Sequence, residues 1–290
     1  MHEHGHGHSH APQGALGSLL AALGLTLGFA AVEAVAGWWS GSLALLSDAG
    51  HMLADSLALG VAATATVLAR RQPSRRHSYG LGRAEILAAF GNALVMIGLV
   101  TVIAVEAIER LRQPVPVAGG TVLAVAFVGL LVNLAAAWIL SRDRRNLNVR
   151  AALLHVIGDL LGSVAALVSG AVILLSGWTP IDPLLSLAIS ALILFSAVRV
   201  LREAVHALME GVPLHLDAEQ IRQAMCDVEG VVAVHELHVW SLSATQIALS
   251  AHVEVRDLSG WPATLASLRH TLDEEYAIGH VTLQPEPAHP

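Results

Sequence analysis

Charge is scarce in this sequence, and lysine is absent from it. Only 13% of the 290 residues are charged, about half the share found in soluble proteins, and the mean hydropathy is +0.62. These values exclude an ordinary soluble enzyme and a disordered protein, and they indicate a membrane protein. All sixteen basic residues are arginine, and 23 acidic residues bring the net charge to −7, which argues against a nucleic-acid partner. The single cysteine, Cys226, excludes an intrachain disulfide and any paired-cysteine metal motif.

Long apolar runs occupy most of the chain. A helix needs about 20 mainly apolar residues to span a bilayer, and six runs meet that length. From about residue 211 the composition changes, with eleven acidic residues and three arginines giving a net charge of −8. We therefore expect a His-rich tail at 1–14, a six-helix membrane domain at 15–208 and a separate domain at 209–290. The expected spans are 16–39, 43–69, 84–111, 119–140, 152–176 and 182–204.

The arginines are distributed unevenly between the connections of these spans. They gather after the second and fourth spans and at the end of the sixth, whereas the connections after the first and fifth spans have none. Because arginine-rich connections stay on the cytoplasmic side of a membrane, both termini and the C-terminal domain are expected to face the cytoplasm. The arginines concerned are Arg70, Arg71, Arg75, Arg76, Arg83, Arg142, Arg144, Arg145, Arg150, Arg199 and Arg202.

The C-terminal segment alternates between helical and extended patterns. Helical spacing occurs at 217–228, where Asp217 suits the N-cap position, and again at 262–276. Alternation typical of strands occurs three times. The order α-β-β-α-β predicts a small α+β sandwich, with one face of the sheet packed on two helices. The expected strands are 231–241, 246–256 and 280–284.

Two of the expected spans carry the same pattern of histidine and aspartate. His51 and Asp55 lie four residues apart in the second span, and His155 and Asp159 lie four residues apart in the fifth. Residues at this spacing project from one face of a helix. An ionisable side chain in the bilayer costs about 2.5–3.5 kcal/mol, so each needs a reason to be there. Two such faces brought together supply two nitrogens and two carboxylates, a tetrahedral set suited to Zn²⁺.

Other interpretations of the embedded polar residues remain open. One such pair alone also fits a proton relay or a contact between helices, and it is the match between two spans that favours a metal. Asp48, one turn before His51, is a candidate for a supporting residue behind the ligands, a proton carrier or a spare ligand. For the remaining embedded polar residues, hydrogen bonding between helices is the expected role. These residues are Glu33, Asn92, Glu106 and Asn133.

The N-terminus has a compositional signature of its own. Histidine occupies every second position from 2 to 10, separated by small or acidic residues. Such a tract binds metal without fixing a coordination geometry, and it has no reason to fold without metal. The alternative is an expression tag, although tags usually have uninterrupted histidine runs.

Taken together, these patterns resemble the cation diffusion facilitator family of zinc-exporting metal/proton antiporters. The resemblance covers nearly the whole chain and is closest to the bacterial zinc-efflux branch. It implies a secondary transporter of the bacterial inner membrane and not an enzyme, with a ferredoxin-like cytoplasmic domain and a homodimeric assembly. It also implies Zn²⁺ as substrate and as a bound structural or regulatory ion, with Cd²⁺ as a further substrate and protons as counter-substrate. The matching stretches are SDAGHMLAD (47–55), RHSYGLGRAE (76–85), LLHVIGDLLGS (153–163), DP (182–183), LMEGVP (208–213), HELHVWSL (235–242), LSAHVEV (249–255) and HVTLQPE (280–286).

The resemblance assigns roles to individual residues. It places the transport site on His51, Asp55, His155 and Asp159. A second family site lies in the loop after the second span, and here only His77 matches it.

Further positions correspond in the C-terminal part of the chain. The family's cytoplasmic metal site maps onto His235 and His252, with Glu286 as third ligand. A charge contact between the membrane and cytoplasmic domains maps onto Arg83 and Glu210.

Proton coupling follows from the chemistry of the expected ligands. Carboxylates and neutral imidazoles bind metal, whereas their protonated forms do not, so a site exposed alternately to two sides exchanges metal for protons. An intramembrane metallohydrolase is the main rival, but a catalytic zinc keeps one position open, and no HExxH motif occurs here. A metal sensor or storage protein is a third candidate, and it leaves the paired intramembrane residues unexplained.

Overall fold

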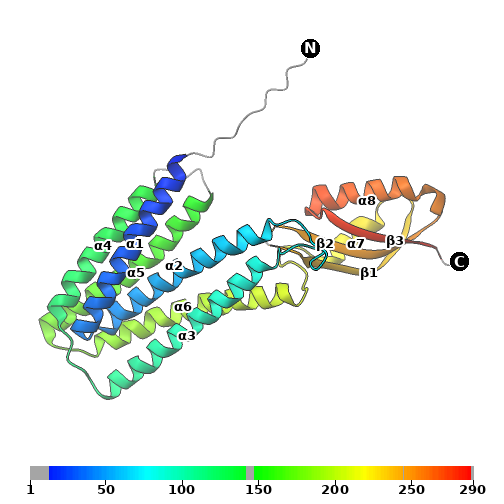
Figure 1. The fold of residues 1–290 in the computed structure, drawn as a ribbon. Helices are drawn as coiled ribbons and strands as arrows, with labels where there is room; N and C mark the ends of the chain where they lie inside the picture. The colour runs from blue at the N-terminus through cyan, green and yellow to red at the C-terminus, as the bar shows by residue number, and fades with distance from the viewer. Residues whose placement is uncertain (1–12, 142–146, 244, 289–290) are drawn as a thin grey trace, which may run out of the picture. The chain divides into compact units, whose positions relative to one another are not determined.

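The computed structural model describes residues 13–141, 147–243 and 245–288 (Figure 1). Six long helices come first among the described residues, and each is long and apolar enough to cross a membrane. They confirm the six expected spans, with the fifth helix beginning at residue 147 instead of 152. The helices are α1 (Gln13–Ser40), α2 (Leu43–Ala69), α3 (Ala84–Arg112), α4 (Gly119–Ser141), α5 (Leu147–Ser176) and α6 (Ile181–Leu208).

The described chain forms two compact units. One contains the chain up to residue 59 together with 94–197, and the other contains 60–93 with the chain from residue 198 onward. Helices α1, α4 and α5 belong to the first unit alone, whereas α2, α3 and α6 contribute to both.

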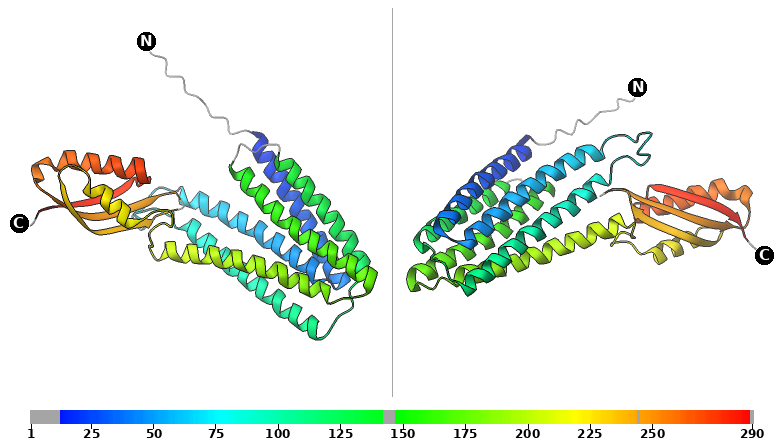
Figure 2. Two further views of the ribbon diagram at one scale, coloured as in Figure 1. Left: turned by 180° about the vertical axis from the view of Figure 1, so that it is seen from behind. Right: turned by 60° about the horizontal axis from the view of Figure 1, so that its bottom comes forward.

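In the first unit, α4 runs beside both α1 and α5 (Figure 2). Glycines at the contact let the backbones come close. A Cβ at Gly170 of α5 would lie 2.5 Å from the backbone nitrogen of Leu123, and one at Gly119 of α4 would lie 2.8 Å from Ile173. Lipid tails are as apolar as the helices, so close packing of small residues is one of the forces that hold membrane helices together.

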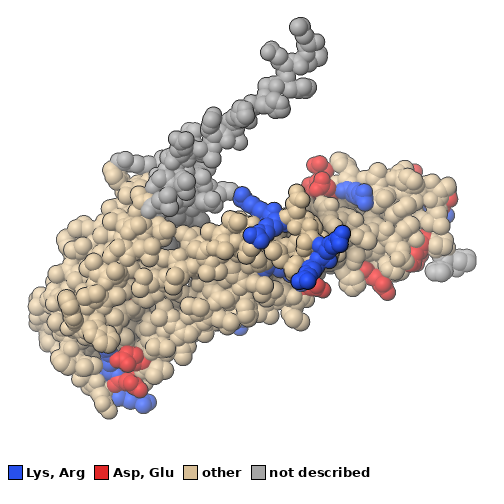
Figure 3. All heavy atoms as spheres, in the orientation of Figure 1, with Lys and Arg blue, Asp and Glu red and all other residues tan. Residues whose placement is uncertain are grey.

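The outward surface of the helices is apolar. Leu57, Phe127 and Phe195 are among the large side chains that are more than half exposed. Charged side chains are sparse along the helices on the face drawn in Figure 3. An apolar surface of this extent suits lipid contact and not water.

Asp182 of α6 is hydrogen-bonded to the first residues of α2. Its carboxylate accepts hydrogen bonds from the backbone nitrogens of Leu43 (2.6 Å) and Ala44 (3.3 Å) and from the hydroxyl of Ser42 (2.6 Å). The hydroxyl of Ser169 on α5 donates to the same carboxylate over 3.1 Å. Asp182 is fully buried. It therefore caps α2 from outside and joins three helices through one carboxylate.

The C-terminal elements confirm the expected α-β-β-α-β order. Asp217 caps the first helix as predicted, accepting hydrogen bonds from the backbone nitrogens of Glu219 and Gln220. Strands β1 and β2 pair antiparallel, and β2 and β3 pair parallel, so the sheet order is β1-β2-β3. The elements are α7 (Ala218–Cys226), β1 (Val231–Ser241), β2 (Ile247–Val255), α8 (Trp261–Tyr276) and β3 (His280–Pro287), with a short 3-10 turn at Leu258–Gly260 before α8.

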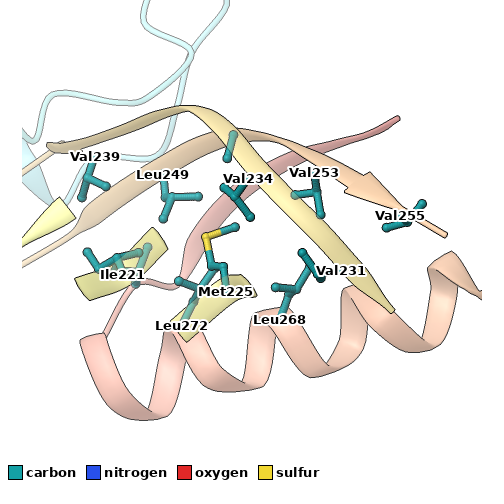
Figure 4. Packing of buried hydrophobic residues seen from close by; sticks show 12 residues of the cluster. Ile221, Met225, Val231, Val234, Val239, Leu249, Val253, Val255, Leu268 and Leu272 are labelled. Atoms are coloured by element: carbon teal, nitrogen blue, oxygen red, sulfur yellow. The ribbon is translucent and has the colours of Figure 1, made fainter. Parts of the chain in front are cut away.

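The core of this part lies between the sheet and its two helices (Figure 4). Side chains of α7 and α8 meet the inward residues of the strands, and all of them are buried. Because neighbouring strand residues point to opposite faces, the other face of the sheet is left for polar side chains. Core members include Ile221, Met225, Val234, Leu249, Val253, Leu268 and Leu272.

Candidate metal centre

The structure brings together predicted metal ligands from two membrane helices. His51 Nε2 on α2 lies 3.5 Å from Asp55 Oδ2, one turn along the same helix. The same nitrogen lies 4.0 Å from Asp159 Oδ1 on α5. Side chains separated by these distances can converge on one ion after small rotations. His155 stands one turn before Asp159 on α5, and its side chain lies outside the described residues.

Exposure differs among the three described ligands. Asp159 is 1% exposed, whereas the side chains of His51 and Asp55 are 21% and 19% exposed. The Asp159 carboxylate is thus buried, whereas the two predicted α2 ligands are partly exposed.

Asp48 lies one turn before His51 and is buried at 3% exposure. Its carboxyl rests on the backbone of α5 at Gly162, where any side chain would collide with it. The glycine is therefore what lets α2 and α5 approach at this level. No hydrogen bond or ion pair joins Asp48 to the described ligands. Its roles as supporting residue, proton carrier or spare ligand all stay predictions.

A second group of predicted ligands meets on the polar face of the C-terminal sheet. His235 and His252 are paired across β1 and β2, and their ring centroids are 5.3 Å apart. His252 Nδ1 lies within hydrogen-bonding distance of Glu286 Oε1, at 2.8 Å, and His235 Nε2 lies 3.2 Å from Glu286 Oε2. One potential ligand atom from each residue lies within 4.8 Å of the others. Two imidazoles and a carboxylate in this arrangement suit Zn²⁺.

The surroundings favour the ionised form of Glu286. Partial burial acts to raise its pKa, but hydrogen bonds from His252 and Gln284 and the charges of His252 and His235 outweigh it. The pKa of Glu286 is therefore lowered from its ordinary value. The ionised carboxylate is the form of Glu286 that can bind a metal ion.

Two acidic neighbours of this group were not predicted from the sequence. Glu254 lies 3.8 Å from His235, and Glu236 lies 3.5 Å from His252. Glu254 follows His252 by two residues in β2, so strand alternation was the available signal. Glu236 had no such signal, because β1 is irregular between His235 and His238 and Glu236 adopts a φ of 49°.

The loop after α2 holds the other two predicted features. His77 is exposed, and among the described residues it belongs to no group of three potential ligands close enough to hold an ion. Arg83 and Glu210 form the expected charge pair, with Arg83 Nη2 donating to Glu210 Oε1 over 2.9 Å. Both side chains are exposed, so this pair contributes at most about 1 kcal/mol.

Comparison with known proteins adds independent information. The family model for the cation efflux transmembrane domain matches residues 19–209, and the model for the cation efflux protein cytoplasmic domain matches 213–288. The zinc transporter ZitB of Escherichia coli (strain K12) is 46% identical over 92% of this chain and 86% of its own length. ZitB of Yersinia pestis is 43% identical over 93% and 88%. The cadmium, cobalt and zinc/H(+)-K(+) antiporter of Bacillus subtilis (strain 168) is 40% identical over 92% and 88%.

Proposed function

The chain belongs to the cation diffusion facilitator family of cation efflux proteins, and from that membership we propose that it exports zinc from the cytoplasm in exchange for protons. It is a secondary transporter and not an enzyme. We assign the transported ion to His51, Asp55, His155 and Asp159. Its six apolar helices make it an integral membrane protein, and we place it in the bacterial inner membrane with both termini in the cytoplasm.

The observation that carries this proposal is the approach of His51 on α2 to Asp159 on α5. Their 4.0 Å separation joins two helices whose sequences each carry a histidine and an aspartate four residues apart. With His155, the donor set is two nitrogens and two carboxylate oxygens, which suits Zn²⁺ and similar divalent ions. Four protein ligands leave no open position for a catalytic water, so the set suits transport better than hydrolysis.

Exchange for protons follows from the same donor atoms. Metal binds to the deprotonated carboxylates and neutral imidazoles, so binding displaces protons and protonation displaces metal. When the site faces the cytoplasm it takes metal, and when it faces outward protons enter and expel the metal. The Bacillus relative is named for exchange against both H⁺ and K⁺, which makes K⁺ a second candidate counter-cation. Its name includes cadmium and cobalt, and we propose Cd²⁺ as a further substrate.

We also propose that the cytoplasmic group of His235, His252 and Glu286 binds Zn²⁺ as a structural or regulatory ion. The donors fit, because two imidazoles and one ionised carboxylate already stand within ligand distance of one another. Bound zinc would join all three strands on the polar face of the sheet. The cytoplasmic domain model that matches this chain is a dimerisation domain by its name, and it supports a homodimer. The His-rich tail gathers metal for the pathway, and residues 1–12 lie outside the described structure.

Ion uptake into everted membrane vesicles tests the proposal. An acidic lumen should drive zinc inward, and dissipating the pH gradient with an ionophore should stop accumulation. Zn²⁺, Cd²⁺, Mn²⁺ and Fe²⁺ are compared in the same vesicles, with vesicles lacking the protein as control. Zinc uptake that ignores the pH gradient would contradict proton exchange, and absence of protein-dependent uptake would contradict zinc transport itself.

A further inference from the structure

Glu33 of α1 is an acidic residue that the zinc pathway leaves without a role. Its side chain is 0% exposed, and neither carboxylate oxygen has a hydrogen-bond partner among the described residues. A hydrogen bond to another helix was expected for this residue from the sequence, and the described structure contains none. Buried groups without partners are rare in folded proteins, and an absent ion is one of their explanations.

The surroundings of Glu33 on α4 add an oxygen of a different kind. A Cβ at Gly129 would lie 3.0 Å from Glu33 Oε1, so the carboxyl rests against this part of α4. Asn133 follows one turn later on the same face of α4 and is also 0% exposed. Its Nδ2 donates to Ser163 Oγ over 3.0 Å, and its Oδ1 has no partner among the described residues. The amide oxygen of Asn133 is thus a second buried oxygen without a described partner, one turn from the α4 glycine that Glu33 contacts.

A third oxygen without a described partner lies on α2, where α2 contacts α5. Ser163, which accepts the hydrogen bond from Asn133, directly follows Gly162, and the carboxyl of Asp48 rests on that glycine. Asp48 Oδ2 has no hydrogen-bond partner among the described residues. Glu33, Asp48 and Asn133 therefore present unpartnered oxygens from three helices around one stretch of the α4–α5 contact.

Among the described residues, no positively charged side chain is paired with these oxygens. In the described part of the chain neither Glu33 nor Asp48 forms an ion pair. Glu33 instead lies within electrostatic range of two other carboxyl groups, those of Asp48 and Asp159. A proton shared between two carboxyl groups holds their oxygens within hydrogen-bonding distance, and no hydrogen bond joins Glu33 to Asp48. A proton on one buried carboxyl would neutralise that group alone, whereas a cation bound between the oxygens would also give a partner to the oxygens that a proton leaves unpaired.

We propose that Glu33, Asp48 and Asn133 form an oxygen-only site for a monovalent metal counter-cation, for which K⁺ is the probe. The donor set contains carboxylate and amide oxygens and no imidazole or thiolate, so it suits hard cations better than the nitrogen-containing set proposed for zinc does. The inference rests on the proposed function, because a counter-cation has meaning only if zinc is transported. It adds a site distinct from the four zinc ligands.

The proposed cation site lies close enough to the proposed zinc ligands to affect zinc binding. Asp159, the buried carboxylate of the proposed zinc site, lies within electrostatic range of both Glu33 and Asp48. A cation held by those oxygens repels a divalent ion at the neighbouring ligands, and in a medium of low dielectric constant that repulsion is strong. Zinc and the counter-cation therefore disfavour each other's binding. Such mutual exclusion is what an exchanger requires.

The test uses the full-length protein in everted vesicles with equal pH on both sides and an added protonophore. The lumen is loaded with KCl, NaCl or choline chloride, and the initial rate of zinc uptake is measured. The wild type should be faster with lumenal K⁺ than with choline, and in Glu33→Gln the ratio of the two rates should fall to unity. Asn133→Leu, which keeps both carboxylates, should also lose the K⁺ effect. Glu106→Gln is the control, because Glu106 is a carboxylate on another membrane helix, α3, whose side chain is exposed and already paired with Arg110.

A wild type that shows no K⁺ effect while still transporting zinc under a pH gradient would overturn this inference and leave the proposed function standing. A Glu33→Gln variant that keeps the full K⁺ effect would also overturn it. Loss of the effect in Glu33→Gln but not in Asn133→Leu would identify a proton carrier and contradict a metal-cation site. Absence of zinc uptake in the wild type under any gradient would instead contradict the proposed function.

A second measurement uses the wild type alone, so its result does not depend on whether the variants fold. In detergent, the thermal unfolding midpoint of the wild type should rise when KCl replaces choline chloride at equal ionic strength, because a ligand that binds only the folded state stabilises it. An equal midpoint in both salts would overturn the inference without any variant.

Discussion

Asp182 offers a quantitative test of how the helices that carry the proposed metal ligands are held in place. Its carboxylate receives two backbone hydrogen bonds from the first turn of α2 and two hydroxyl hydrogen bonds, one from Ser42 and one from Ser169 of α5. Helix α2 carries His51 and Asp55, and α5 carries Asp159. The change Asp182→Ala removes both acceptor oxygens, and with them all four hydrogen bonds, and leaves the four donors in a buried environment.

The expected loss can be worked from these contacts. Loss of a helix N-cap costs about 0.5–2 kcal/mol, and a hydrogen bond to a charged group contributes about 1.5–3 kcal/mol. Ser42 Oγ also accepts a bond from the nitrogen of Leu45 and keeps part of the cap. One cap and one charged hydrogen bond together predict a loss of about 3–4 kcal/mol in the free energy of unfolding.

Thermal unfolding in detergent measures this loss. A change of 1 kcal/mol moves the midpoint by about 2–4 °C in chains of 150–250 residues, so Asp182→Ala should lower it by roughly 10 °C. Ser169→Ala removes one of the four bonds and should have a clearly smaller effect. Asp182→Asn should recover most of the midpoint, because its oxygen accepts from the α2 backbone and its amide donates to the serine hydroxyls. An Asp182→Ala midpoint no lower than that of Ser169→Ala would refute the reasoning.

Three further predictions concern selectivity, pH and the tail. His51→Asp should raise the ratio of Cd²⁺ to Zn²⁺ transport in matched vesicles, because it replaces a nitrogen that zinc favours by a carboxylate able to chelate a larger ion; an unchanged or lower ratio with zinc transport intact would contradict the role of His51. The lowered pKa of Glu286 adds stability above its unfolded-state pKa that is lost as pH falls through its folded-state pKa. Acid titration of unfolding should therefore show a steeper loss in the wild type than in Glu286→Gln, and equal slopes would count against the ion pairing. Deletion of residues 1–10 should lower zinc efflux only modestly at normal expression, and complete loss would show that the tail belongs to the pathway.

The secondary structure could be predicted from the sequence because its signals are local. An apolar run of sufficient length is enough to identify a membrane helix, and alternation identified all three strands of the C-terminal sheet. The pairing of His51 with Asp159 was also predictable, since the two spans repeat one pattern. The convergence of His235, His252 and Glu286 was predicted from the family resemblance.

What the sequence did not reveal depends on contacts between distant segments. Asp182 was identified only as part of a matching motif, because its partners on α2 lie about 140 residues away. The hydrogen bond expected for Glu33 does not occur among the described residues, and the contact of its carboxyl with Gly129 exists only once α1 and α4 pack. Asn133 was predicted correctly to bond between helices, to Ser163. Such results require the three-dimensional arrangement, because no periodicity encodes which helix faces which.

The central claim is that Asp159 and its partners hold the transported zinc, and Asp159→Ala tests it most directly. The variant is compared with the wild type and with Asp257→Ala, an exposed residue of the C-terminal domain. Zinc uptake into everted vesicles under an acid-inside gradient is measured at matched expression, together with the size-exclusion profile. We predict that Asp159→Ala abolishes uptake with an unchanged profile, because three remaining ligands leave the shell incomplete. Near wild-type uptake by Asp159→Ala would contradict the account.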